Sequence, residues 1–292
     1  MPILLAVIAV LGVSASGPLM AATAAPALAI ALWRNAGGAA LIAPFALTRN
    51  RGELRGLNGR QWLMSALAGA MLAAHFAAWV SALKLTSVAA ATALVTTQLI
   101  WVVLIDRIKG AKPTTAVVVG MGVSISGVLV ISGFDFALSG RAITGDALAI
   151  LGGLFAALYL VVGNEVRKTL STTAYTLLCY GFCAVLLASA ALIFGIPLTG
   201  FSATSWLLIA AVTVSAQLLG HSLLNHLLAV MSPMVISLLI LLEVPGAALL
   251  AGLFLGQTPS WGVYVGLVLI LAGLCVVAAR RQETPAEVVL AE

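Results

Sequence analysis

The sequence predicts an all-α polytopic membrane protein with ten transmembrane helices, arranged as two inverted five-helix repeats around a central cavity. Three observations lead to this prediction: the composition, ten long apolar stretches and an internal repeat. Hydrophobic residues make up 62% of the 292 residues and charged residues only 8%, against about 25% charged residues in a soluble domain. The mean hydropathy is +1.18. One soluble core cannot hold so much apolar surface, so lipid must surround much of the chain.

Ten apolar stretches have the length of about 20 residues that a helix needs to cross a bilayer. They lie at residues 3–22, 26–47, 62–83, 86–105, 114–133, 145–164, 174–195, 205–227, 234–255 and 260–279. They are too long and too uniformly apolar for barrel strands, which alternate over about 10 residues. No Lys or Arg precedes the first stretch, so we interpret it as a span and not as a cleaved signal peptide.

The chain contains an internal repeat, because residues 74–130 align without a gap with residues 220–276 after a shift of 146 positions. The identical pairs include His75 with His221, Leu104 with Leu250, Gly110 with Gly256, Val117 with Val263, Gly120 with Gly266, and Gly127 with Gly273. The repeat predicts two five-helix units at residues 1–134 and 135–282. A C-terminal tail at 283–292 follows, and we expect it to be disordered.

Basic residues indicate the orientation in the membrane. Eleven of the 14 lie in connections on one side, namely Arg49, Arg51, Arg55, Arg60, Arg107, Lys109, Lys112, Arg167, Lys168, Arg280 and Arg281. The other side has Lys84 and Arg141, and Arg34 lies within a span. The positive-inside rule places the basic side and both termini in the cytoplasm. Since five crossings per half is an odd number, the second half is expected to be inverted.

Inverted repeats of this kind are typical of secondary transporters, which hold substrate near the midplane between the repeats. The connections are short, and no Gly-rich loop ending in Gly-Lys-Ser/Thr occurs. We therefore expect no cofactor and no metal. The expected partners are a small-molecule substrate and the lipid bilayer, without nucleic acid, and we expect a monomer or weak homodimer.

Two histidines lie near the middle of spans, where polar side chains are costly and usually mark a pathway. A spacing of four residues places Gln217, His221 and Asn225 on one helical face. The first half has His75 and Trp79 at the positions that match His221 and Asn225. We interpret these faces as walls of a cavity for a ligand with an apolar ring and a polar end. In the alternative, the histidines only join helices through hydrogen bonds.

Three more side chains are predicted to line this cavity. Gln98 and Trp101 are three residues apart on one face of the fourth span, and Tyr159 lies in the middle of the sixth. A buried tyrosine hydroxyl or tryptophan N–H needs a hydrogen-bond partner. For Trp101, a position facing lipid is the alternative.

Glu243 is the only acid deep within a predicted span, two residues before Pro245. Proline kinks a helix and frees a backbone carbonyl. We consider two roles for Glu243, a proton site coupled to transport or the structural partner of Arg34. Arg34 is interpreted chiefly as structural, with reception of a substrate carboxylate as the alternative.

The ninth span reads Leu-Glu-Val-Pro at 242–245 and then Leu-Gly at 255–256, before Gly266 and Gly273. With ten spans in two inverted halves, this resembles the drug/metabolite transporter superfamily in its EamA-type branch. Within this branch, the chain most resembles bacterial exporters of aromatic amino acids, on the basis of its interior Trp and His residues. The resemblance implies a basket of helices around a central cavity, with the fifth and tenth spans outside it. Gln257 departs from the acid usual in the family, and the first span has no acid, so proton antiport is not implied.

Together these features predict a secondary transporter that exports amino acids, aromatic ones preferred, and similar amphipathic metabolites across the bacterial inner membrane by alternating access. One alternative is a drug or other metabolite permease of the same superfamily. Another is an intramembrane enzyme that uses His75, His221 and Glu243 as acid and base. The absence of paired carboxylates and metal motifs argues against an enzyme, and we expect no catalytic residue.

Overall fold

Helices form all the regular structure that the computed structural model describes, which covers residues 2–136, 139–258 and 261–281. Within these ranges there is no strand. The tail predicted at 283–292 lies outside the described residues. An all-α chain is therefore confirmed for the part that the structure describes.

Eight helices, or runs of consecutive helices, are long and apolar enough to cross a membrane. They are α1 (Pro2–Ser14) with α2 (Ser16–Ala22), α3 (Ala27–Arg49), α5 (Gly59–Ala82), α6 (Val88–Val95) with α7 (Gln98–Ile108), α9 (Gly140–Arg167), α10 (Thr172–Ile193), α11 (Ala203–Val212) with η1 (Thr213–Ser222) and α12 (Leu223–Leu227), and α13 (Pro233–Leu241) with α14 (Glu243–Leu255). The short α4 (Arg51–Arg55) connects α3 to α5. These eight candidates agree with a multi-pass membrane protein.

The fifth and tenth predicted spans correspond to α8 (Thr115–Phe136) and α15 (Trp261–Arg281). Their described apolar parts are shorter, Thr115–Gly127 and Trp261–Gly273. Ten crossings and the inverted arrangement of the two halves therefore stay predictions.

Five of the helices have a serine as the N-cap residue. The hydroxyls of Ser87, Ser139, Ser171, Ser202 and Ser232 each accept a backbone N–H three residues further on, at the starts of α6, α9, α10, α11 and α13. The first N–H groups of a helix have no partner within the helix, so these caps define where each helix starts.

Four of the eight candidate spans are interrupted along their length. Pro18 and Pro245 lie in the first turn of α2 and α14, where a proline costs no hydrogen bond within the helix. At the end of α6, the hydroxyl of Thr96 donates to the carbonyl of Ala93 at 2.6 Å. The fourth interruption is η1, a π-helix within the run from α11 to α12. Such interruptions expose backbone and side chains inside the bundle and are frequent at functional sites.

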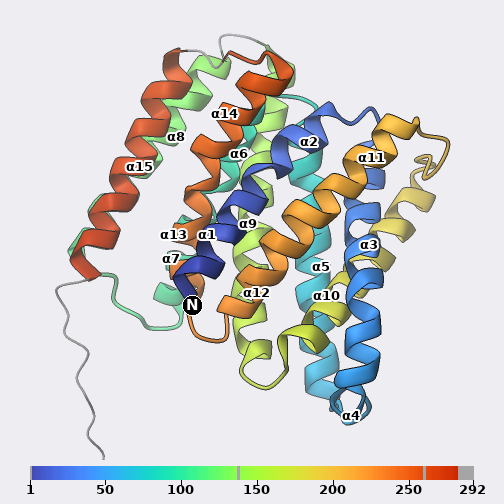
Figure 1. Cartoon of the computed structure of the whole chain (residues 1–292). Helices are drawn as coiled ribbons and strands as arrows, with labels where there is room; N and C mark the ends of the chain where they lie inside the picture. Colours follow the sequence, from blue (N-terminus) through green and yellow to red (C-terminus); the bar gives the residue numbers. More distant parts are fainter. Residues whose placement is uncertain (1, 137–138, 259–260, 282–292) are drawn as a thin grey trace, which may run out of the picture.

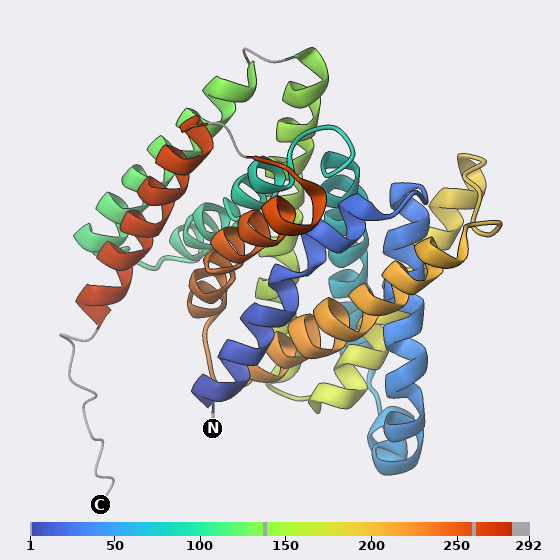
Figure 2. The same cartoon turned by 45° about the horizontal axis from the view of Figure 1, so that its top comes forward.

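The helices pack into a bundle with a separate pair at one flank. Helix α5 packs along α9, α10 packs on both α3 and α5, and α1 lies along η1. Figures 1 and 2 show α8 and α15 side by side at the edge of the bundle. All eight residues of the alanine-rich α6 are buried, so this short helix lies in the interior.

Helices α8 and α15 meet at their backbones. A Cβ atom on Gly273 would lie 2.3 Å from the carbonyl oxygen of Gly120, and a Cβ atom on Gly127 would lie 2.5 Å from that of Gly266. Between these contacts, the hydroxyl of Ser124 donates to the carbonyl of Ile270 at 3.5 Å. Pairing of this order makes the two helices antiparallel, and small residues permit their close approach.

Candidate binding cavity

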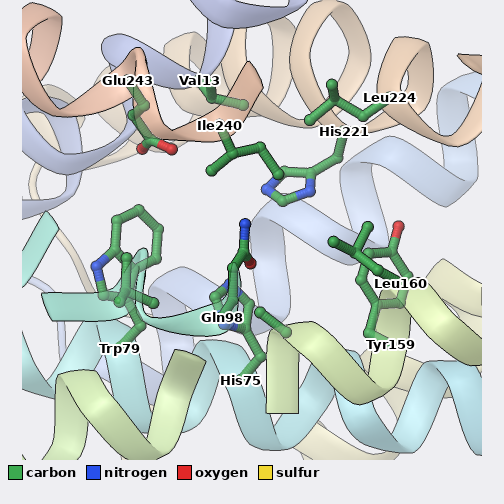
Figure 3. A pocket seen from close by; sticks show the side chains of 12 residues that line it. Val13, His75, Trp79, Gln98, Tyr159, Leu160, His221, Leu224, Ile240 and Glu243 are labelled. Carbon is green, nitrogen blue, oxygen red and sulfur yellow. The ribbon is translucent and has the colours of Figure 1, made fainter. Parts of the chain in front are cut away.

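A small cavity lies where the interrupted helices approach α5 and α9 (Figure 3). Its polar and aromatic lining consists of His75, Trp79, Gln98, Tyr159, His221 and Glu243, and its apolar lining consists of Val13, Val95, Ala156, Leu160, Leu224 and Ile240. The volume is about 30 Å³, enough for two or three water molecules at about 10–15 Å³ each. An organic ligand enters this cavity only if the helices move apart.

The structure places five of the eight predicted substrate-binding residues at this cavity, together with Glu243. The five are His75, Trp79, Gln98, Tyr159 and His221. The other three predicted residues, Trp101, Gln217 and Asn225, are not among its lining residues, and neither is Arg34. The histidine pair matched by the repeat thus meets at one site.

The ring of His75 is held by the backbone of α9. Its Nδ1 lies 2.9 Å from the carbonyl oxygen of Gly152. A carbonyl only accepts hydrogen bonds, so Nδ1 carries the proton of this bond. The indole of Trp79 stacks on this imidazole, with ring centroids 5.7 Å apart. The edge contact of His221 with Phe76, at 5.4 Å between centroids, positions the second histidine.

Three buried polar atoms at the cavity have no hydrogen-bond partner within the described structure. They are Nε1 of Trp79, Nε2 of Gln98 and Oε1 of Glu243. Each of these side chains is at most 5% exposed. A buried polar group without a partner costs about 1–3 kcal/mol, and such groups are rare in folded proteins. The cavity thus has two donors and one acceptor that are free to bond a polar group.

Arg34 is fully buried, forms its hydrogen bonds with neutral groups and has one nitrogen, Nη2, without a partner in the described structure. Its Nε donates to Oε1 of Gln217 at 2.8 Å, and its Nη1 donates to Oγ of Ser16 at 3.1 Å. The guanidinium also lies over the ring of Phe76, 4.2 Å from the centroid. These contacts join α3 to α2, α5 and η1.

Glu243 does not form an ion pair with Arg34. An ion pair within 4.0 Å is found between Lys168 and Glu165, at 2.7 Å, and among the described residues none is found between Glu243 and Arg34. Direct pairing, one of the two roles considered for Glu243, is thus absent from this conformation. Its carboxyl group faces the cavity instead (Figure 3).

Gln217 and His221 lie four residues apart on the π-helix η1. The two residues were expected on one face because an α-helix stacks positions four apart. In η1 the hydrogen bonds span five residues and the turn is wider. His221 lines the cavity, whereas Gln217 is fully buried, accepts from Arg34 and donates to Oδ1 of Asn35 at 2.9 Å. The two side chains thus have different partners in this conformation, and a role of Gln217 in binding substrate stays a prediction.

Asn225 and Trp101 are not among the lining residues of the cavity and have other surroundings. Oδ1 of Asn225 accepts a hydrogen bond from the hydroxyl of Tyr159, and its carbonyl accepts from Nε of Arg167 at 3.0 Å. Asn225 therefore positions a lining residue. Trp101 is partly buried on α7. The apolar lining residues had no sequence signal, because neighbouring positions of the same spans are equally apolar.

At the end of the bundle that holds α4, a carboxylate joins two distant parts of the chain. Glu53 accepts hydrogen bonds from the backbone N and Oγ of Ser171, both at 2.5 Å, and from Nδ2 of Asn50 at 3.0 Å. Burial alone raises the pKa of Glu53, but the bonds from Ser171 and Asn50 and the charge of Arg167 bring it below the ordinary value of 4.5.

These features define a class: a multi-pass membrane protein, helical throughout its described residues, with a small cavity enclosed by candidate membrane-spanning helices. The model of the EamA-like transporter family matches residues 1–133 and 143–279. The chain therefore belongs to the EamA-like transporter family, whose members are transporters within the drug/metabolite superfamily.

Other comparisons show the fold. A solved structure described as "Crystal structure of protein" is 18% identical to this chain, covers 97% of it and 99% of its own length, and has a TM-score of 0.74. At this identity the likeness concerns the fold alone. No curated protein matches the chain.

Proposed function

We propose that this protein is a secondary transporter that exports amino acids, aromatic ones preferred, and similar amphipathic metabolites by alternating access. The observation that carries the proposal is the cavity, where apolar walls surround the unpartnered polar atoms of Trp79, Gln98 and Glu243. Apolar walls with a few placed polar groups are typical of small-molecule sites. Membership of a transporter family makes a transported molecule the expected ligand.

The helix pair α8 and α15 supports the inverted repeat. Gly120 and Gly127 have the repeat partners Gly266 and Gly273, and each contacts the partner of the other. Reciprocal contact between antiparallel helices is what a two-fold axis perpendicular to them produces. We therefore propose ten crossings in two inverted units, residues 1–134 and 135–282, with the axis in the membrane plane.

The aromatic preference rests on the stacked pair of His75 and Trp79 and on the nearby Tyr159. Aromatic rings bind one another in offset or edge contacts. The sequence resembles the bacterial aromatic amino-acid exporter YddG in its interior Trp and His residues, which supports the same preference. Because the cavity now measures about 30 Å³ and ligand pockets measure about 300–1,000 Å³, substrate entry requires rearrangement, and the interrupted helices are suitable hinges.

Alternating access here means that the site opens first to one side of the bilayer and then to the other. The bias of basic residues supports a location in the bacterial inner membrane with both termini in the cytoplasm. Partners are the small-molecule substrate and the lipid bilayer, and the protein acts as a monomer or weak homodimer. Glu243 remains a candidate proton site, and Arg34 a structural support of the cavity wall.

A counterflow experiment tests the proposal. Purified protein in liposomes loaded with unlabelled amino acids should take up labelled phenylalanine, tyrosine or tryptophan faster than empty liposomes. Replacement of His75 or His221 by alanine should reduce this uptake. His226→Ala is the matched control, because His226 is exposed and bonds Thr172 outside the cavity.

The outcomes separate the candidate functions. Flat uptake across a panel of amino acids contradicts amino-acid export. Transport of toxic analogues without amino-acid exchange would instead favour a drug or metabolite permease. Uptake that survives in both cavity variants would place the substrate elsewhere. Running the panel with and without a pH gradient, in the parent and in Glu243→Gln, tests proton coupling.

A further inference from the structure

Three unpartnered atoms at the cavity differ in their chemistry and position. Trp79 and Gln98 come from α5 and α7 and have unpartnered N–H donors, whereas Glu243 at the start of α14 has an unpartnered carboxyl oxygen. Figure 3 shows the carboxyl group of Glu243 on one wall, opposite the indole of Trp79 and the amide of Gln98. The cavity thus has an accepting side and a donating side.

No cation of the protein neutralises the accepting side within ion-pair distance. Within the described structure, Arg34 bonds to neutral oxygens and has no ion pair with Glu243. The titratable side chains that share the cavity are His75 on α5, Tyr159 on α9 and His221 on η1. His75 already donates Nδ1–H to Gly152, and Tyr159 donates its hydroxyl to Asn225. A buried carboxylate requires a partner of positive charge or a proton.

The donating side suits an anion in the same way. An indole N–H only donates, and the amide nitrogen of Gln98 supplies further donors. Hydrogen bonds to an ionised acceptor are stronger than those to a neutral one. A carboxylate against Trp79 and Gln98 would pair donors that are buried without partners.

From this opposition we infer that the site binds a primary amine at Glu243 and a carboxylate at Trp79 and Gln98. The inference deepens the proposed function, on which it rests, because it assigns the two ends of a zwitterionic amino acid. Leu160, Leu224 and Ile240 form apolar walls of the cavity, against which the side chain of the amino acid would pack. We expect the ammonium group of the substrate to matter more for binding than its carboxylate. A buried carboxylate without a partner costs more free energy than the neutral N–H groups of Trp79 and Gln98 without one.

Competition against labelled phenylalanine in the counterflow experiment tests the assignment with three compounds: unlabelled phenylalanine, phenethylamine without the carboxylate, and 3-phenylpropionate without the amine. The parent protein should be inhibited by phenylalanine and phenethylamine, with 3-phenylpropionate at least tenfold weaker. Equal inhibition by 3-phenylpropionate and phenethylamine overturns the inference without any variant. Absence of phenylalanine exchange in the parent is a different result, which contradicts the proposed function itself.

Variants separate the two ends. Glu243→Gln should weaken phenethylamine at least tenfold, whereas Trp79→Phe should weaken phenylalanine relative to phenethylamine, since it removes one N–H but keeps the ring. Glu165→Gln is the matched acid control, because Glu165 is exposed and bonds Lys168. If Glu243→Gln leaves the preference for amines unchanged, Glu243 is not the ammonium site. Size-exclusion profiles show which variants fold, and Glu243→Asp, which retains the charge, should keep the preference for amines.

Discussion

Gly120 and Gly273 touch backbone to backbone between α8 and α15, so that a Cβ atom on Gly273 would lie 2.3 Å from the carbonyl oxygen of Gly120. Their repeat partners, Gly266 and Gly127, make the reciprocal contact at 2.5 Å. Two contacts that exchange partners in this way are what the two-fold axis proposed for the repeats would produce. The duplication seen in the sequence therefore has a physical counterpart in the pair that lies at the edge of the bundle.

Gly273→Ala should destabilise this pair. The added Cβ would meet backbone, which cannot give way as a side chain can, so the helices must separate and lose contacts. We expect a loss of about 1–3 kcal/mol, the usual cost of overpacking. Thermal unfolding in detergent measures it. Gly122→Ala on α8 is the control, because its Cβ would have no atom within 4 Å. Equal melting temperatures for the two variants would contradict the close contact.

Arg34→Lys should also lower stability, although it keeps the charge. A lysine cannot reproduce the planar fork that bonds Gln217 and Ser16 or the stacking on Phe76. We expect a loss of about 2–3 kcal/mol, since hydrogen bonds to charged groups contribute about 1.5–3 kcal/mol each. Arg49→Lys is the control, because Arg49 is exposed and lies 6.0 Å from the ring of Phe45. Similar melting temperatures for both variants would refute the structural role of Arg34.

Glu53 should make stability depend on pH at the acid end. Its pKa is lower in the folded protein than its ordinary value of 4.5, so the folded state favours the ionised carboxylate. This contribution is present above pH 4.5 and is lost as the pH falls through the lower pKa of the folded state. Melting temperatures of the parent and Glu53→Gln should therefore differ at pH 7 and converge as the pH falls from 4.5 through the lower pKa of the folded state.

A control identifies the source of this effect. Glu165→Gln removes an exposed acid whose partner Lys168 is also exposed, and such surface pairs contribute little. It should follow the parent at every pH. If Glu53→Gln and Glu165→Gln give the same profile, the bonds from Ser171 and Asn50 do not stabilise the folded state.

Tyr159→Phe should reduce substrate affinity without unfolding the protein. The hydroxyl of Tyr159 bonds Oδ1 of Asn225, which is fully buried. Its removal leaves a buried acceptor unpaired, at a cost of about 1–3 kcal/mol, and frees the ring that lines the cavity. We expect about a tenfold rise in the substrate concentration for half-maximal exchange. Tyr264→Phe is the control, because Tyr264 is exposed on α15. A parent-like value for Tyr159→Phe would remove Tyr159 from the site.

Much of the candidate site was predictable because polar side chains are rare in these spans. His75, Trp79, Gln98, Tyr159, His221 and Glu243 stand out against apolar neighbours, and all six line one cavity. The apolar lining residues could not be predicted in this way. In a uniformly apolar helix, a side chain that faces a cavity and one that faces lipid belong to the same residue types.

The sequence by itself determined that the chain is helical and membrane-embedded, because composition and the length of apolar stretches depend on no contact between distant residues. It also determined the repeat offset and the few polar positions. Only the tertiary structure decided which polar groups meet. Helix packing brings Glu243 to the same cavity as Trp79 and Gln98, and it gives Gln217 a hydrogen bond from Arg34 while His221 lines the cavity. The rotation of a helix about its axis is fixed by its neighbours, so one-dimensional spacing cannot supply it.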